Sequence, residues 1–132
     1  MMKVDHIGYV VKEIEPAIKQ FTEIYQYSIL KEVIYDPKQR VKLAMLASGL
    51  HHVELIQPID ATSPSYDFLQ RGGGLHHICY RVLDIKETIE QLKRQNHLLF
   101  KKPIEAVLFS DRKVAFLYDK KMKQIIELVE EV

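Results

Sequence analysis

The chain has 132 residues, 47% of them hydrophobic and 28% charged, which is the size and composition of one globular domain with a sizeable core. Nineteen Lys and Arg balance eighteen Asp and Glu for a net charge of +1, and no basic run is interleaved with aromatic residues, so nucleic acid is not expected as a partner. No stretch has the apolar length of a signal peptide or a membrane span, so we expect a cytoplasmic protein with no membrane partner.

Alternating hydrophobic residues at 3–11 predict a first strand. Apolar residues at helical spacing then predict a helix: Ile14, Ala17, Ile18, Phe21 and Tyr25. Strands are expected at about 28–35, 40–47 and 51–57. A connector over 59–74 carries Ser63-Pro64, a triple glycine at 72–74 and a short helix near 66–70. After the connector we expect a strand at 76–83 and a helix from Ile85. The chain then ends with strands at about 97–100, 105–109 and 112–130, the last of which is split at 119–121.

The chain also repeats itself, because residues 5–21 align with residues 76–92 at an offset of 71. Seven pairs are identical in the same order: His6/His77, Ile7/Ile78, Tyr9/Tyr80, Val11/Val82, Ile14/Ile85, Ile18/Ile89 and Gln20/Gln91. The second half then has two extra residues, so VELIQ at 53–57 aligns with IELVE at 126–130. This alignment pairs Glu54 with Glu127. The duplication predicts an α+β fold of two tandem βαβββ modules, over 1–58 and 75–132.

Four polar residues recur at matching places in the two predicted strand pairs. Side chains alternate along a strand, so Glu54 points away from Val53 and Leu55. If the apolar side chains face the helices, both carboxylates face the other side. Duplication makes the pair His6 and Glu54 equivalent to the pair His77 and Glu127, and two such half-sites can converge on one centre. Two imidazoles and two carboxylates suit Zn²⁺, Ni²⁺, Co²⁺, Mn²⁺ or Fe²⁺ and leave positions open for water or substrate.

Other interpretations of these residues stay open. A single His or Glu on a strand is more often solvent-facing or hydrogen-bonded than a ligand, and only the repeat favours the metal site. His52 shares a face with Glu54 and is the main alternative ligand. His76 should point away from His77 and be structural, and Cys79 is expected to be a small buried residue without chemistry.

The segments DHIGYVV, VELIQP, GGGLHHICYRV and IIELVEE together resemble the vicinal oxygen chelate superfamily, which includes glyoxalase I, methylmalonyl-CoA epimerase and extradiol dioxygenases. The resemblance runs over nearly the whole chain. It implies that paired βαβββ modules form an open cup-shaped mixed sheet with the helices outside. It further implies one divalent metal, with Ni, Co or Zn expected and Mn or Fe possible, held by His6, Glu54, His77 and Glu127.

Within that superfamily, Ser63-Pro64 and GLHHICYRV resemble methylmalonyl-CoA epimerases and short glyoxalases I. Glu at both carboxylate positions and the ending IELVEE are more similar to glyoxalase I, because bacterial epimerases can carry Gln at the place of Glu54. The bacterial epimerase pattern has a second Glu on the third strand, where this chain has Leu43, or Lys42 with a one-residue shift. The segment 102–124 also lacks the Gly-rich, His-Pro-containing stretch of many epimerases.

The resemblance implies a lyase or isomerase that removes a proton α to the carbonyl of a thioester or hemithioacetal through a metal-stabilised enediolate. Glu127 is the expected general base, and Glu54 is its catalytic counterpart on the other face of the substrate. One alternative is a bleomycin-resistance-like binding protein without a metal. Another is an extradiol dioxygenase, against which a fourth metal ligand argues. A homodimer is expected.

Overall fold

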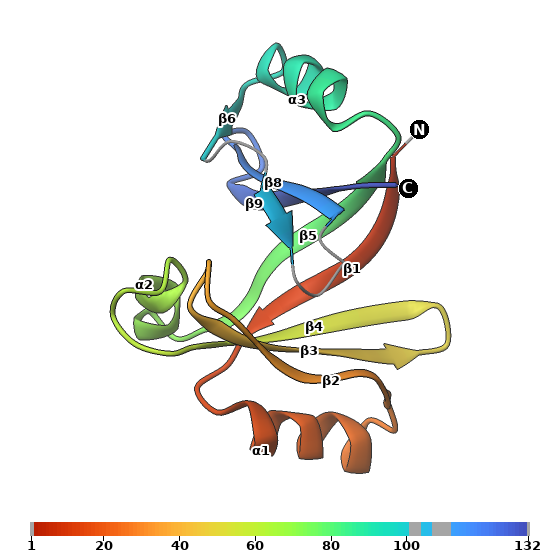
Figure 1. Cartoon of the computed structure of the whole chain (residues 1–132), viewed down its shortest axis with the longest axis vertical. Helices are drawn as coiled ribbons and strands as arrows, with labels where there is room; N and C mark the ends of the chain where they lie inside the picture. The colour runs from red at the N-terminus through yellow and green to blue at the C-terminus, as the bar shows by residue number, and fades with distance from the viewer. Residues whose placement is uncertain (1, 101–103, 107–111, 132) are drawn as a thin grey trace. The chain divides into compact units, whose positions relative to one another are not determined.

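The computed structural model describes residues 2–100, 104–106 and 112–131 (Figure 1). The chain divides into two compact units, one of His6–His76 and one of Met1–Asp5 with His77–Val132. No helix in the described ranges is long and apolar enough to cross a membrane. The elements are β1 (Lys3–Val10), α1 (Ile14–Lys19), η1 (Gln20–Ile24), β2 (Ser28–Asp36), β3 (Val41–Ser48), β4 (His51–Pro58), α2 (Tyr66–Gln70), β5 (Gly74–Val82), α3 (Ile85–Lys93), β6 (His97–Leu99), β7 (Ile104–Ala106), β8 (Arg112–Asp119) and β9 (Gln124–Glu130).

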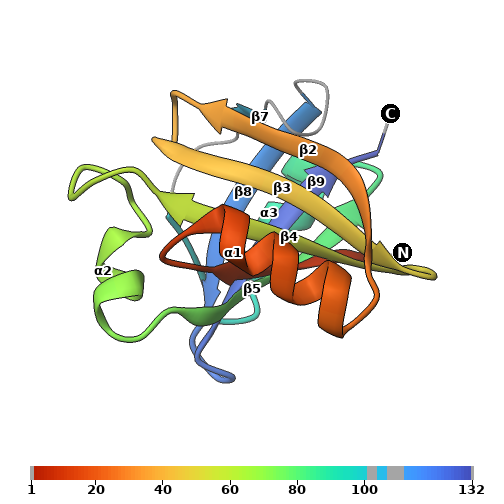
Figure 2. The ribbon, with the colours of Figure 1, turned by 90° about the horizontal axis from the view of Figure 1, so that it is seen from below.

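The first module is a mixed sheet with one helix. Strands β2, β3 and β4 are antiparallel, and β1 pairs in parallel with β4. Helix α1 lies along one face of the sheet (Figures 1 and 2), because its apolar residues recur on one side. The buried core of the first module comprises Ile14, Ala44, Leu46, Val53 and Leu55. Glu54 lies between two of these core residues on β4, so its side chain points to the opposite face, as predicted.

The helix predicted from Ile14 is confirmed, but its last turn is wider than the turns of a regular α-helix. It runs into a π-helical turn, η1, where the Tyr25 N–H donates to the Gln20 carbonyl oxygen at 3.4 Å. Phe21 lies in this turn and meets three tyrosine rings edge to face, those of Tyr9, Tyr25 and Tyr27, at centroid distances of 5.0 to 6.0 Å. This aromatic cluster fixes the wider turn against the sheet.

The second module has the same plan. Strand β5 pairs in parallel with β9, and β8 is antiparallel to β9. Both β6 and β7 pair with β8, so together they take the place that β2 has in the first module. Helix α3 begins where the Asp84 carboxylate accepts a hydrogen bond from the Glu87 N–H, and it packs on Ala115, Leu117 and Leu128. The strand predicted at 105–109 has its described part at Ile104–Ala106, and 107–111 lie outside the described residues.

The strand registers repeat between the modules. Gly8 lies opposite Glu54 in the first module, and Cys79 lies opposite Glu127 in the second. Cys79 stands 71 positions after Gly8, so the offset of the sequence is also that of the structure. The two-residue slippage arises in a hairpin turn, which is Gly49-Leu50 between β3 and β4 but 120–123 between β8 and β9. The predicted α+β class and the two βαβββ modules are confirmed.

A side chain from the last strand of each module holds the first N–H of its helix. The Ile14 N–H donates to Gln57 Oε1 at 2.8 Å, and the Ile85 N–H donates to Glu130 Oε2 at 3.1 Å. Helix N-termini leave N–H groups without intrahelical partners. Gln57 takes the place of a side-chain cap at α1, which has none, and Glu130 adds to the cap that Asp84 forms at α3. Gln57 and Glu130 each lie three residues after the paired carboxylates, on the helix-facing side of the strand.

Replacing Gln57 with Leu is expected to lower the free energy of unfolding by about 1–2 kcal/mol, because the Ile14 N–H loses its acceptor. Gln57→Glu keeps the acceptor, as the second module does at Glu130, and should stay close to wild type. Urea unfolding at neutral pH measures both. Equal stability of the Leu and Glu variants would show that this hydrogen bond contributes little.

The connector is fixed at its start by a polar cluster. Arg40 Nη2 lies 2.6 Å from Asp60 Oδ2, and the hydrogen bond from Arg40, with further ones from Thr62, lowers the pKa of Asp60 below its ordinary value. The Ser63 hydroxyl donates to the Arg40 carbonyl oxygen and accepts from the Ile59 N–H at 3.1 Å. Ser63 of the Ser-Pro pair therefore ties the connector to the turn between β2 and β3, ahead of the predicted helix α2.

Gly73 is constrained by a close approach of the backbone. A Cβ at this position would lie 2.8 Å from the Val10 carbonyl oxygen, at a φ of +66°. Gly49 has a similar φ of +60° with nothing within 4 Å of the added atom.

Gly49→Ala should therefore cost only the backbone strain, about 1–2 kcal/mol of the free energy of unfolding. Gly73→Ala should cost about 1–3 kcal/mol more because it adds the clash, and denaturant unfolding of both variants measures the difference.

Candidate metal centre

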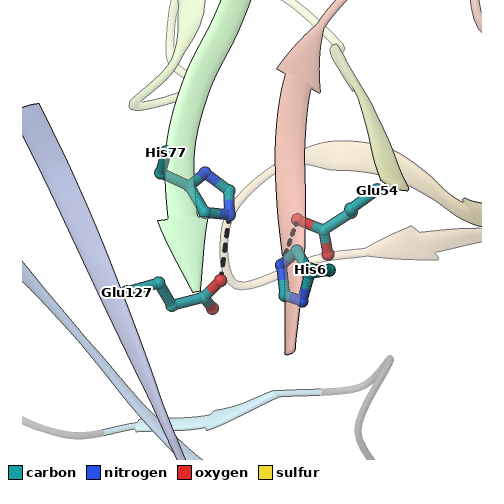
Figure 3. Close-up of side chains that lie close together, drawn as sticks. All are labelled: His6, Glu54, His77 and Glu127. Atoms are coloured by element: carbon teal, nitrogen blue, oxygen red, sulfur yellow. Dashed lines mark ion pairs between the residues drawn. The ribbon is translucent and has the colours of Figure 1, made fainter. Parts of the chain in front are cut away.

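The first module carries a buried His–Glu pair on the sheet face turned away from α1. His6 lies on β1 and Glu54 on the neighbouring β4, and the pairing of Gly8 with Glu54 sets their levels. His6 Nε2 lies 3.5 Å from Glu54 Oε1 (Figure 3). The exposed fraction is 1% for His6 and 5% for Glu54. The parallel pairing of the module's first and last strands thus brings together two predicted ligands.

The second module carries the equivalent His–Glu pair, with a shorter distance between the two side chains. His77 on β5 and Glu127 on β9 are joined by the register that sets Cys79 opposite Glu127. His77 Nε2 lies 3.0 Å from Glu127 Oε1 (Figure 3), and the residues are 1% and 3% exposed. The Phe116 ring meets the His77 ring edge to face at 5.7 Å, which restricts the orientation of the imidazole.

The chemistry of these donors fits a divalent cation. A buried carboxylate is costly unless its charge is compensated, and a neutral imidazole compensates it only in part. Each of the four side chains offers one ligand atom. Imidazole nitrogens and carboxylate oxygens are borderline-to-hard donors that bind Zn²⁺, Ni²⁺, Co²⁺, Mn²⁺ and Fe²⁺. A bound cation would balance the buried negative charge in each module.

The other residues singled out in the sequence divide into two groups. His52 and Leu43 lie on the same sheet face as Glu54, where His52 is partly buried and Leu43 is buried. His76 instead packs edge to face on the Phe68 ring of α2 at 4.8 Å, in agreement with a structural role. Cys79 is fully buried on β5, as expected.

Two residues beside the pairs were not identified from the sequence. Met45 lies directly opposite Glu54 across β3 and β4, and Phe116 lies opposite Glu127 across β8 and β9. Cross-strand neighbours follow from the hairpin register, which the turn length sets. Met45 and Phe116 are 71 positions apart, the offset of the duplication, and this was the signal in the sequence that could have identified them. Because Met45, Phe116 and Leu43 are all apolar, neither carboxylate has a second acid beside it on these hairpins.

A sequence model of the Glyoxalase/Bleomycin resistance protein/Dioxygenase superfamily matches residues 5–116. The chain is 29% identical to the uncharacterised protein YqjC of Bacillus subtilis, over 98% of this chain and 93% of that one. It is 30% identical to an ethylmalonyl-CoA/methylmalonyl-CoA epimerase of Cereibacter sphaeroides, over 69% of each chain. Against the mitochondrial methylmalonyl-CoA epimerase of Mus musculus the identity is 27% over 70% of this chain, which spans about half, 53%, of that relative.

Solved structures show the same architecture. A hypothetical protein from Bacillus halodurans superposes with a TM-score of 0.89 at 30% identity, over 99% of this chain and 95% of that one. A methylmalonyl-CoA epimerase from Mycobacterium tuberculosis superposes with a TM-score of 0.84 over 98% of this chain and 87% of that one. At 24% identity the second likeness concerns the fold alone. With the family match covering most of its length, the chain belongs to the Glyoxalase/Bleomycin resistance protein/Dioxygenase superfamily.

Proposed function

We propose that His6, Glu54, His77 and Glu127 together hold one divalent metal ion, with Ni²⁺, Co²⁺ or Zn²⁺ as the first candidates. The observation that carries this proposal is the repetition of one buried His–Glu pair, at the same strand register, in both modules. Both pairs are buried, and a cation shared between them would balance the charge of the two carboxylates. Four protein donors would leave room on such an ion for oxygen atoms of the substrate.

The proposed reaction is proton transfer at the carbon α to a carbonyl of a thioester or hemithioacetal. When bound, the metal ion supplies Lewis-acid stabilisation of negative charge on the substrate oxygens. Glu127 takes the α-proton and returns it, and Glu54 is its counterpart from the other module. Both carboxylates are buried, so few water molecules compete with the substrate for them.

Two reactions of this kind are candidates. The names of the epimerase relatives support a CoA thioester as substrate. The apolar residues Leu43 and Met45 next to Glu54 support a glyoxalase I-like reaction instead, since the third strand offers no separate second base on the described face. Epimerisation needs a proton removed from one face and delivered to the other, so it would require Glu54 itself to act.

The test begins with metal-stripped protein loaded separately with Ni²⁺, Co²⁺ and Zn²⁺. We expect close to one ion per chain by elemental analysis. The loaded protein is then assayed with the methylglyoxal–glutathione hemithioacetal and with methylmalonyl-CoA in deuterated water, where NMR follows loss of the α-proton. Failure of the wild type to take up any of these ions would refute the proposal and favour a metal-free binding protein.

A further inference from the structure

His52 makes the two modules unequal beside their matched His–Glu pairs. One step before the Ile7–Val53 pair, β1 brings His6 level with His52 on β4. At the equivalent level of the second module, His77 pairs with Ile125. The first module therefore has a second imidazole where the second module has an aliphatic side chain.

The surroundings of His52 leave it accessible. It shares the sheet face of Glu54, because the two residues are two positions apart on one strand. Across the hairpin it lies opposite Ala47, whereas Ile125 lies opposite Tyr118. A methyl group is far smaller than a phenol ring, so the cross-strand neighbour covers less of His52 than Tyr118 covers of Ile125.

The imidazole of His52 is also unengaged within the described ranges. It is partly buried, and no hydrogen bond, ion pair or ring contact to another described residue is found for it. A partly buried imidazole can hydrogen-bond to water or to a bound ligand. Neutral imidazole keeps one N–H donor, so His52 can bind an oxygen atom without being protonated.

We propose that His52 donates a hydrogen bond to a carboxylate oxygen of the substrate and thereby fixes which end of the substrate faces the first module. This inference rests on the proposed function. The substrate class is accordingly one with a carboxylate in addition to the two oxygens that face the metal. The aliphatic Ile125 offers no such donor, so the duplicated half-sites accept chemically different ends of the same molecule.

The experiment compares two small acids on Co²⁺-loaded protein. Lactate and tartronate share an α-hydroxy carboxylate, and tartronate adds a second carboxylate. Dissociation constants come from isothermal titration calorimetry and from the visible spectrum of Co²⁺. We expect the wild type to bind tartronate about tenfold or more tightly than lactate, and His52→Ile, which copies the second module, to remove most of that preference.

Two control variants sharpen the result. His52→Gln keeps an N–H donor and should keep part of the preference. His51→Gln should leave it unchanged, because His51 is exposed and points to the other face of the sheet. The proposal is overturned if His52→Ile retains the wild-type ratio, or if the wild type binds neither acid. It is also overturned if His52→Ile loses Co²⁺, because His52 is then a ligand. Failure of the wild type to bind Co²⁺, Ni²⁺ and Zn²⁺ alike would instead refute the proposed function itself, and this inference with it.

Discussion

His77→Ala is expected to remove metal from the whole chain, not from half of it. If both His–Glu pairs hold one ion, each histidine supplies one of four protein ligands. Loss of a partner that only supports a ligand already costs 10- to 100-fold in metal affinity in known sites, so loss of a ligand should cost more than about 100-fold. His6→Ala should give the same result, because the duplication makes the two histidines equivalent.

The metal content of each variant after dialysis is measured by elemental analysis, and the dissociation constant by competition with a chelator. His77→Leu is a second variant that has no donor atom but fills more of the space beside Phe116, in case the Ala variant unfolds. His76→Ala is the matched control, since its ring packs on Phe68 and not on Glu127. Two ions per wild-type chain, with one remaining in each His variant, would show two separate sites and contradict a shared one.

The order of the elements could be predicted because periodicity and duplication agree on it. The strand at residues 3–11, the helix from Ile14 and the short helix at 66–70 were all found from local patterns. The π-helical turn at Gln20–Ile24 could not be, since it depends on the packing of Phe21 among three tyrosines. Two short strands, β6 and β7, pair with β8 where the first module has one strand. Hydrophobic spacing in the sequence does not predict this pairing.

The pairing of His6 with Glu54, and of His77 with Glu127, could be predicted because a repeat identifies rare polar residues that local propensity ignores. Residues whose role depends on register or on a distant backbone atom were missed. Met45 and Phe116 become neighbours of the carboxylates only once the hairpin turns are known. Gln57 and Glu130 are ordinary polar strand residues until a helix N-terminus is found beside each.

If Glu127 is the proposed general base, Glu127→Gln is expected to lower turnover by about 100- to 10,000-fold, the usual contribution of such a base, while KM changes little. The amide keeps an oxygen that can contact a cation but cannot accept the α-proton. Glu127 is 3% exposed and lies 3.0 Å from His77, so water has little access to replace the lost base. Metal content is measured alongside, to separate the loss of a base from the loss of a ligand.

Glu54→Gln is the matched comparison, because Glu54 occupies the equivalent place in the first module at 5% exposure. If Glu127 alone moves the proton, Glu54→Gln keeps most of the turnover and of the α-proton exchange in deuterated water. If both carboxylates act, each on one face of the substrate, the two variants lose activity to a similar extent, and only then can the chain invert a stereocentre. Wild-type turnover in Glu127→Gln would show that this residue is not the base, since an amide has no basic site for the proton.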